Sequence, residues 1–285
     1  MSTTLSAPTG VRPGGRIRYG FADGMVVMRR NLLQLSRIPT VLVFELVQPI
    51  MFVLLFRFVF AGNITNLPLG LSYVMYLMPG IFVQNAIFGS TTTAIGLAED
   101  MKKGIVDRFR SLPMARSAVL VGRTTSDLAK NLILVLLVIG VGYLVGFRFH
   151  NGPFGAIAMI VVVLAVGFVF SWISATVGLA IKEVEGVQAA LFTGIFPIVF
   201  ISSALVPVQG MISWIQPVAD RNPVTIWANC ARVLALGNVA LPTDRATHTI
   251  PTTDLGGLLL WSAIWIVGLL VVFVPVAIRM YRRLT

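Results

Sequence analysis

Long apolar runs alternate with short polar connections along most of this chain. Six runs reach the length of about 20 residues that an α-helix needs to cross a bilayer. The pattern therefore predicts an all-α membrane protein with six transmembrane helices. These helices are expected approximately at 40–61, 73–97, 120–146, 155–181, 187–207 and 257–278.

The first 39 residues carry a different, amphipathic pattern. Apolar residues recur at steps of three or four, at Ile17, Phe21, Met25, Met28, Leu32 and Leu35. Arginines border this stripe, which predicts a helix that lies in the membrane interface without crossing it. The chain thus divides into a tail with an interfacial helix, 1–39, and a six-span transmembrane domain, 40–285.

The charge supports this organisation and sets an orientation. The chain is 56% hydrophobic and 12% charged, with a net charge of +11. Its basic residues gather in the tail 1–39, in the connection 98–119 and after the last run, as expected of cytoplasmic segments. We expect both termini in the cytoplasm, and we assign the positive charge to membrane orientation and not to nucleic-acid binding.

Catalytic and metal-binding motifs are missing from the sequence. None of the four lysines follows a glycine, so the chain has no P-loop for ATP. Cys230 is the single cysteine, and His150 and His248 lie far apart. We expect no ATPase site, no cofactor and no metal on this chain.

A short charged segment, EDMKKGIVDRFRSLPMAR, stands out at 99–116. Met101, Ile105, Phe109 and Leu112 form an apolar stripe, and Pro113 follows it. This predicts a short amphipathic helix on the cytoplasmic side. It either floats among the lipid headgroups or docks into a groove of a soluble partner.

The residues KGIVDRFRSLPMAR resemble the cytoplasmic motif of permease subunits of type-2 ABC exporters, in particular the daunorubicin-resistance permease group. Similar fragments follow in the same order over nearly the whole chain: MPGIFVQN at 78–85, GFRFHNG at 146–152, EVEGVQ at 183–188 and NPVT at 222–225.

The resemblance implies a role for each segment. The charged segment would be the coupling helix on an ATP-binding subunit, the N-terminal helix the interfacial connecting helix, and the outer connection between spans five and six a set of re-entrant helices. Two permease chains, identical or homologous, would pair with two nucleotide-binding subunits, which bind ATP and Mg. The residues expected on the ATPase subunit are Glu99, Asp100, Lys103, Ile105, Asp107, Arg108, Phe109 and Arg110.

Polar residues inside the predicted spans are candidates for the substrate pathway. Glu45 and Gln48 lie in span one, and Gln84 and Asn85 in span two. Glu45 either attracts cations at the inner gate or serves as a structural partner for an arginine of the interfacial helix, or its carboxylate reaches the interface. Gln84 and Asn85 could line a polar path, whereas the small and hydroxyl residues that follow them indicate helix packing.

Together these features favour the permease subunit of an ATP-driven exporter in a bacterial inner membrane. Its expected cargo is an amphipathic drug, such as an anthracycline-like antibiotic, or a lipid, taken from the cytoplasm or the inner leaflet. The alternative is an ion-coupled secondary transporter that uses Glu45, although one isolated carboxylate makes a poor relay. An intramembrane enzyme is disfavoured because no span carries a suitable catalytic group.

Overall fold

The computed structural model describes residues 39–60, 71–104, 118–181, 183–237 and 254–284, and the regular elements among them are all helical. The elements follow in the order α2 (Pro39–Leu55), the π-helix η1 (Phe56–Phe60), α3 (Tyr73–Gly89), α4 (Thr91–Lys102), α6 (Ala118–Val145), α7 (Gly152–Ile181), α8 (Val184–Phe200), η2 (Val208–Gly210), α9 (Gln216–Arg221), α10 (Pro223–Leu236) and α11 (Leu255–Leu284).

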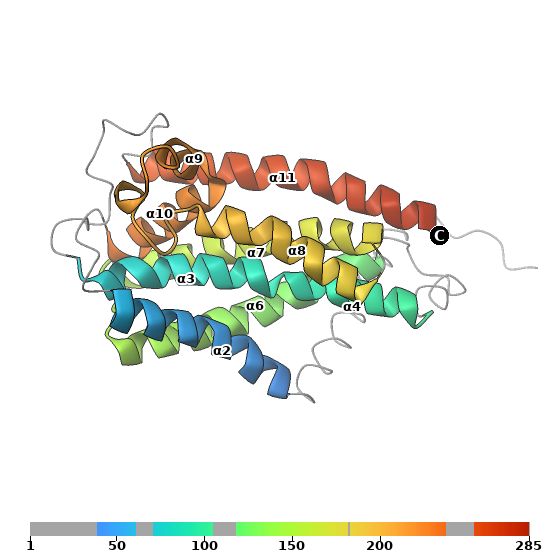
Figure 1. Ribbon diagram of the computed structural model, residues 1–285, viewed down its shortest axis with the longest axis horizontal. Coiled ribbons are helices and arrows are strands. Elements are labelled where there is room, and N and C mark those ends of the chain that lie inside the picture. The colour runs from blue at the N-terminus through green and yellow to red at the C-terminus, as the bar shows by residue number, and fades with distance from the viewer. Residues whose placement is uncertain (1–38, 61–70, 105–117, 182, 238–253, 285) are drawn as a thin grey trace, which may run out of the picture.

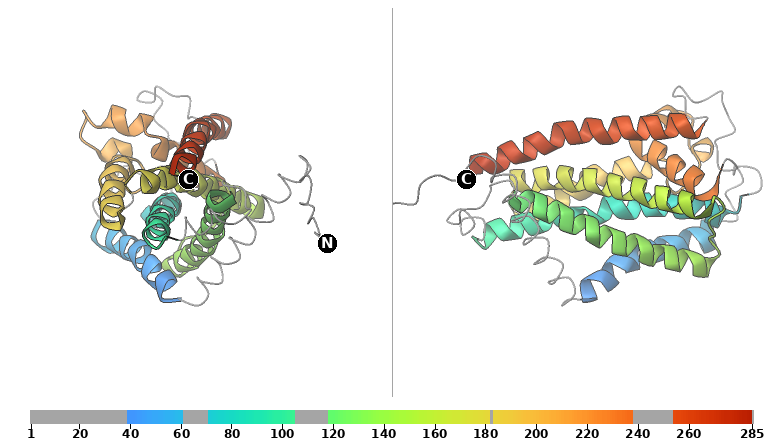
Figure 2. Two further views of the ribbon diagram at one scale, coloured as in Figure 1. Left: turned by 90° about the vertical axis from the view of Figure 1, so that its right-hand side faces the viewer. Right: turned by 180° about the vertical axis from the view of Figure 1, so that it is seen from behind.

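The long helices run side by side along the longest axis of the molecule (Figure 1). Their directions alternate, since α3, α7 and α11 begin at the end where α9 and α10 lie, whereas α2, α6 and α8 begin toward the opposite end (Figures 1 and 2). We call these the α10 end and the α4 end. The predicted interfacial helix of the tail lies outside the described residues.

Four of these helices are long and apolar enough to cross a membrane. They are Tyr73–Lys102, Leu120–Val145, Gly152–Ile181 and Leu255–Arg283. The remaining two expected spans correspond to α2 and α8, which have 17 residues each. The chain is therefore an all-helical, membrane-embedded protein, and the count of six spans stays a prediction.

Helix α7 is the centre of the bundle, because it packs against α3, α4, α6, α8, α10 and α11. Small residues on its buried face let neighbouring backbones approach closely. A Cβ atom at Gly155 would lie 2.4 Å from the carbonyl oxygen of Leu234, and one at Gly178 would lie 2.8 Å from that of Ala94. Larger side chains at these glycines would push α10 and α4 away from α7.

Two helix boundaries differ from the sequence-based expectation. The predicted span 73–97 is a pair of helices, α3 and α4, which meet at Ser90 and continue to Lys102. The hydroxyls of Ser90, Thr91 and Thr92 donate to carbonyl oxygens three residues earlier, at 2.6–2.9 Å, and such bonds compete with the regular helical ladder. The predicted span 187–207 ends at Phe200, because Asn222 caps it.

Asn222 connects α8 to α10 within the motif NPVT. Its Nδ2 donates to the carbonyl oxygens of Ile198 and Ile201, at 2.6 and 2.7 Å, at the end of α8. Its Oδ1 accepts from the backbone N–H of Val224, at 2.9 Å, and so caps the start of α10. One side chain therefore ends one helix and begins another, which fixes the turn between them.

Candidate transport site

A small groove lies between α2 and α3. Its lining combines apolar side chains with amide side chains. Three of the four predicted pathway residues, Gln48, Gln84 and Asn85, line it. The full lining is Gln48, Pro49, Phe52, Ile81, Gln84, Asn85 and Phe88.

The amides of α3 in this groove lack hydrogen-bond partners. Gln84 and Asn85 are 2% and 8% exposed. Within the described part of the chain, neither Oε1 nor Nε2 of Gln84 has a partner, and neither does Nδ2 of Asn85. A buried polar group without a partner costs roughly 1–3 kcal/mol. The groove thus holds three polar atoms whose hydrogen-bonding capacity the described residues leave unfilled.

Aromatic rings extend the apolar side of the groove onto α8. The ring of Phe88 lies 5.4 Å from that of Phe196, edge to face, and the ring of Phe52 lies 6.0 Å from that of Phe200. Phe196 and Phe200 stack at 5.0 Å. The groove is thus flanked by a wall of phenylalanines from three helices.

Glu45 lies one turn before the groove on α2, and its charge is paired. Its Oε1 is 3.0 Å from the Nζ of Lys130 on α6. Lys130 also donates to Thr92 Oγ1, at 2.5 Å, and to the carbonyl oxygen of Gly89, at 3.1 Å. The basic partner of Glu45 thus comes from α6, and one lysine connects α2, α4 and the end of α3.

Lys130 belongs to a row of charged residues along one face of α6. Arg123, Asp127 and Lys130 follow at steps of four and three, so they share a face. Arg123 Nη1 lies 2.7 Å from Asp100 Oδ2, and Thr93 Oγ1 donates to Asp127. The row makes Glu45 one of several carboxylates in the bundle and not an isolated one, which corrects the sequence-based expectation.

The residues assigned to the coupling helix fall into two groups. Glu99 and Asp100 lie in α4, Lys103 follows its last turn, and Gly104 ends the helix with a positive φ of 67°. Glu99 and Lys103 form an exposed ion pair at 2.8 Å, whose hydrogen bond raises the pKa of Lys103. The remaining assigned residues lie outside the described part of the chain: Ile105, Asp107, Arg108, Phe109 and Arg110.

Asp100 is held within the bundle by its ion pair with Arg123 of α6. Arg123 reaches it by crossing Gly96, where a Cβ atom would lie 1.5 Å from Arg123 Nη2. This contact joins the last turns of α4 to α6, immediately before the segment that carries Arg108.

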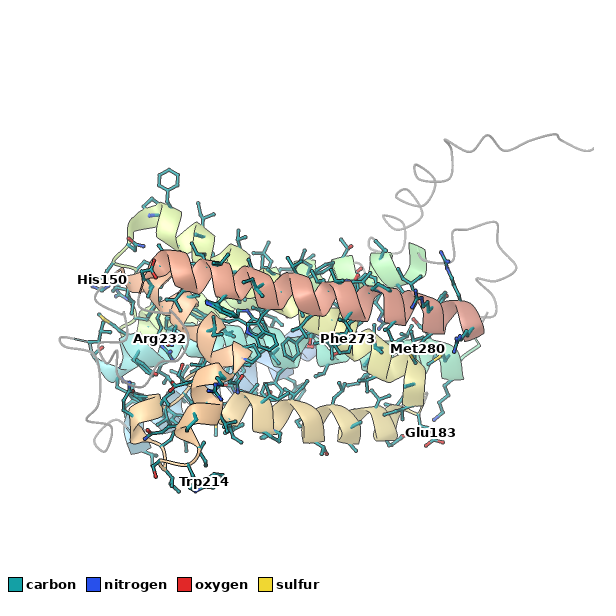
Figure 3. The ribbon with its side chains drawn as sticks, turned by 90° about the horizontal axis from the view of Figure 1, so that it is seen from above. His150, Glu183, Trp214, Arg232, Phe273 and Met280 are labelled. Atoms are coloured by element: carbon teal, nitrogen blue, oxygen red, sulfur yellow. The ribbon has the colours of Figure 1, made fainter. Side chains whose placement is uncertain are left out.

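A second polar centre, around Arg232 of α10, fixes the α10 end. Arg232 is 1% exposed and lies inside the bundle (Figure 3). Its Nε donates to the carbonyl oxygen of Tyr76 at 2.8 Å, and its guanidinium lies 3.7 Å from the centre of the Tyr76 ring. Its other nitrogens donate to Asn229 Oδ1, to the hydroxyl and carbonyl of Ser203, and to the carbonyl of Ala204.

The turn after α8 is held by α3 as well. Tyr73 and Tyr76 donate their hydroxyls to the carbonyl oxygens of Leu205 and Ser203, at 2.9 and 3.0 Å. Gly80 leaves room for this turn, since a Cβ atom there would lie 1.8 Å from the carbonyl oxygen of Ala204. Three consecutive carbonyls after α8, from Ser203 to Leu205, are thus fixed by side chains of α3 and α10.

Sequence reasoning missed both polar centres. It assigned no contact to Arg232, and it did not single out Asp127. The steps of four and three between Arg123, Asp127 and Lys130 were a signal for a shared face on α6. For Arg232 no such signal exists, because its main acceptors are backbone carbonyls, which every sequence supplies.

With this geometry in place, comparison with known proteins gives the family. The family model for the ABC-2 type transporter matches residues 24–236. The chain belongs to this family, whose members are membrane subunits of ABC transporters.

Two relatives indicate the branch of the family. The daunorubicin resistance ABC transporter permease protein DrrB1 of Streptomyces coeruleorubidus is 29% identical over 254 residues, which covers 89% of this chain and 84% of the relative. A Mycobacterium tuberculosis protein named "Probable doxorubicin resistance ABC transporter permease protein DrrC" is 30% identical over 294 residues, with 99% of each chain covered. The chain is therefore similar, over almost its entire length, to permease subunits named for drug resistance.

Proposed function

We propose that this chain is the permease subunit of an ABC exporter that moves amphipathic molecules, drugs of the anthracycline kind or lipids, out of the cytoplasm or the inner leaflet. The observation that carries the proposal is the groove between α2 and α3, with its unpaired amides, in a chain of the ABC-2 family. Phenylalanines beside the groove suit an apolar cargo, and the amides suit its polar groups.

The proposed topology has six spans. α2 and α8 pack against α3 and run along the bundle over a shorter length than the four longer helices (Figures 1 and 2). In this topology the α4 end faces the cytoplasm of a bacterial cell, and η2, α9 and α10 enter the membrane from outside and cap the pathway. The basic residues near the α4 end, such as Arg282 and Arg283, support this orientation.

ATP is hydrolysed on a separate subunit in this proposal. The segment after Gly104 docks on that subunit as the coupling helix, and a second permease chain, identical or homologous, completes the transporter with two ATPase copies. The contact between Asp100 and Arg123 supports a mechanical role, because it connects α4, directly before this segment, to α6.

The test is charge reversal in the coupling segment. We expect Arg108→Glu to abolish stable association with the ATPase subunit, because reversing a charge in a docking interface costs roughly 2–5 kcal/mol, or about 30-fold or more in affinity. Affinity purification of the tagged chain in mild detergent, followed by mass spectrometry, measures which P-loop ATPase accompanies it and in what ratio.

The matched control is Arg283→Glu, which makes the same charge change in an exposed side chain at the end of α11. We expect this variant to retain the ATPase. If Arg108→Glu retains it as well, the coupling assignment of that residue is wrong. If the wild-type chain purifies alone and transports in vesicles without ATP, the secondary-transporter alternative replaces the exporter.

A further inference from the structure

We propose that Arg123, Asp127 and Lys130 of α6 are positioning residues, which make α4, α6 and α2 move together when the segment after Gly104 is displaced. This inference rests on the proposed exporter function, in which that segment docks on the ATPase subunit. Three observations carry it: the order of the polar contacts along α6, the packing of α4 mainly against other helices, and the attachment of α2 to the same row of charges.

The polar contacts of the row follow the antiparallel course of the helices. Each later residue of the row bonds residues that lie earlier in the chain. The bonds join Arg123 to Asp100, Asp127 to Thr93, and Lys130 to Thr92 and Gly89. The row extends over seven residues, about 10 Å along the axis of α6. It therefore holds α4 and α6 in one register over two helical turns.

These polar bonds supply much of the attachment of α4 to α6. The packing of α4 is mainly against α7 and α8, and it touches α6 less. Apolar contacts have no directional preference, so helices can slide on them, whereas a hydrogen bond or an ion pair with hydrogen-bonding geometry fixes both position and orientation. Without the row, a push on the segment between α4 and α6 could separate the two helices.

The ion pair of Arg123 and Asp100 lies where the force would enter. It joins residues 23 positions apart, on the two sides of the segment 105–117. The two side chains are 19% and 17% exposed. Because the attraction between charges grows as water is excluded, this pair resists separation of α4 from α6 more than an exposed pair would.

Lys130 extends the row to α2. Its Nζ lies 3.0 Å from Glu45 Oε1, on the turn before the groove. Gln48 and Phe52 of the same helix line the groove. A displacement of the segment after Gly104 would therefore reach the groove through α6 and α2, and not only through α4 and α3.

The experiment compares transport with ATP hydrolysis in the full complex of this chain and its ATPase subunit in proteoliposomes. Two probes are followed, daunorubicin and a phospholipid with an NBD-labelled headgroup, and the measured quantity is the number of probe molecules moved per ATP hydrolysed. We expect Arg123→Asp to lower this ratio about 10-fold, since changes within a coupling network alter coupling by roughly 2- to 30-fold. ATP hydrolysis and the association of the two subunits should persist.

Exchanging the two charges separates positioning from folding. A chain with both Asp100→Arg and Arg123→Asp has the ion pair again with its charges reversed, and its ratio should return to within about 3-fold of the wild type. A merely structural role would lower the yield of monodisperse complex and leave the ratio of the remaining molecules unchanged.

The variant Gly96→Val tests the same contact without removing a charge. Arg123 crosses α4 at Gly96, where a Cβ atom would lie 1.5 Å from its Nη2, so a valine side chain displaces the guanidinium and should also lower the ratio. The matched control is Gly140→Val, because Gly140 is also a helix glycine and a Cβ atom there would meet no described atom within 4 Å. This control should keep the wild-type ratio.

Three results would overturn the inference and leave the proposed function intact: an unchanged ratio in Arg123→Asp or Gly96→Val, an exchange that stays at the ratio of the single variant, or an equal loss in Gly140→Val. If Arg123→Asp yields no complex, Gly96→Val and its control decide. A wild-type chain that carries no ATPase, or a wild-type complex that moves neither probe, would refute the proposed function, and the inference would fall with it.

Discussion

Replacing Arg232 with methionine is expected to lower the free energy of unfolding by about 3–5 kcal/mol, which is typical when one partner of a buried charged network is removed. Methionine fills a similar volume but donates no hydrogen bonds. The carbonyl oxygens of Tyr76, Ser203 and Ala204 would lose the Arg232 N–H groups that now bond them. We expect a midpoint of thermal unfolding lower by about 10 °C, measured by fluorescence-detected size exclusion in detergent.

The control for this prediction is Arg221→Met, which removes the same side chain from an exposed position on α9 at the same end of the bundle. We expect its unfolding midpoint to stay near that of the wild type. An equal loss in both variants would mean that the α10 end tolerates no loss of positive charge, whereas an unchanged Arg232→Met midpoint would show that the guanidinium does not hold the turn after α8.

The second large effect is expected at Lys130. Changing Lys130 to methionine leaves the partly buried carboxylate of Glu45 without its partner and removes the bonds to Thr92 and Gly89. Removing one partner of a buried ion pair costs about 3–5 kcal/mol, mostly because the other charge remains buried. The same detergent-based unfolding measurement checks this expectation.

A double-mutant cycle separates the pair from its surroundings. We expect Glu45→Gln to restore part of the stability that Lys130→Met removes, because no unpaired charge then remains. Lys103→Met is the matched control, since its ion pair with Glu99 is exposed, and it should change the unfolding midpoint little. Strictly additive effects at Glu45 and Lys130 would contradict a direct interaction between them.

The sequence predicted the helical class of the molecule well, because apolar length is a property of each segment by itself. The starts of α3, α6, α7 and α11 fall within three residues of the predicted starts. The end of α8 was wrong by seven residues, since it depends on a cap from Asn222, more than 20 residues further along the chain. Contacts of this range are not visible in local apolar patterns.

The candidate site also contains residues that local sequence patterns reveal and contacts that they do not. The structure brings Gln48, Gln84 and Asn85 together because α2 packs on α3, and polar residues inside an apolar helix are a local signal. The partners of Glu45 and Arg232 come from other helices, so they could be found only once the packing was known. Sequence reasoning therefore selected three residues that line the groove. It did not find Lys130 as the partner of Glu45, nor the groups that Arg232 bonds.

The ion pair between Glu45 and Lys130 gives α2 a point about which the helix can tilt. α2 packs mainly against α3 and α6, and the pair of Glu45 and Lys130 is its ionic attachment to α6. Phe52 lies seven residues beyond Glu45, about 10 Å along the helix axis. A tilt of about 10° around the ion pair as fulcrum would move Phe52 by roughly 2 Å. A tilt of this kind would change the separation of α2 and α3 at the groove, and it would also move η1, where Arg57 donates to the carbonyl oxygen of Val145 at the end of α6.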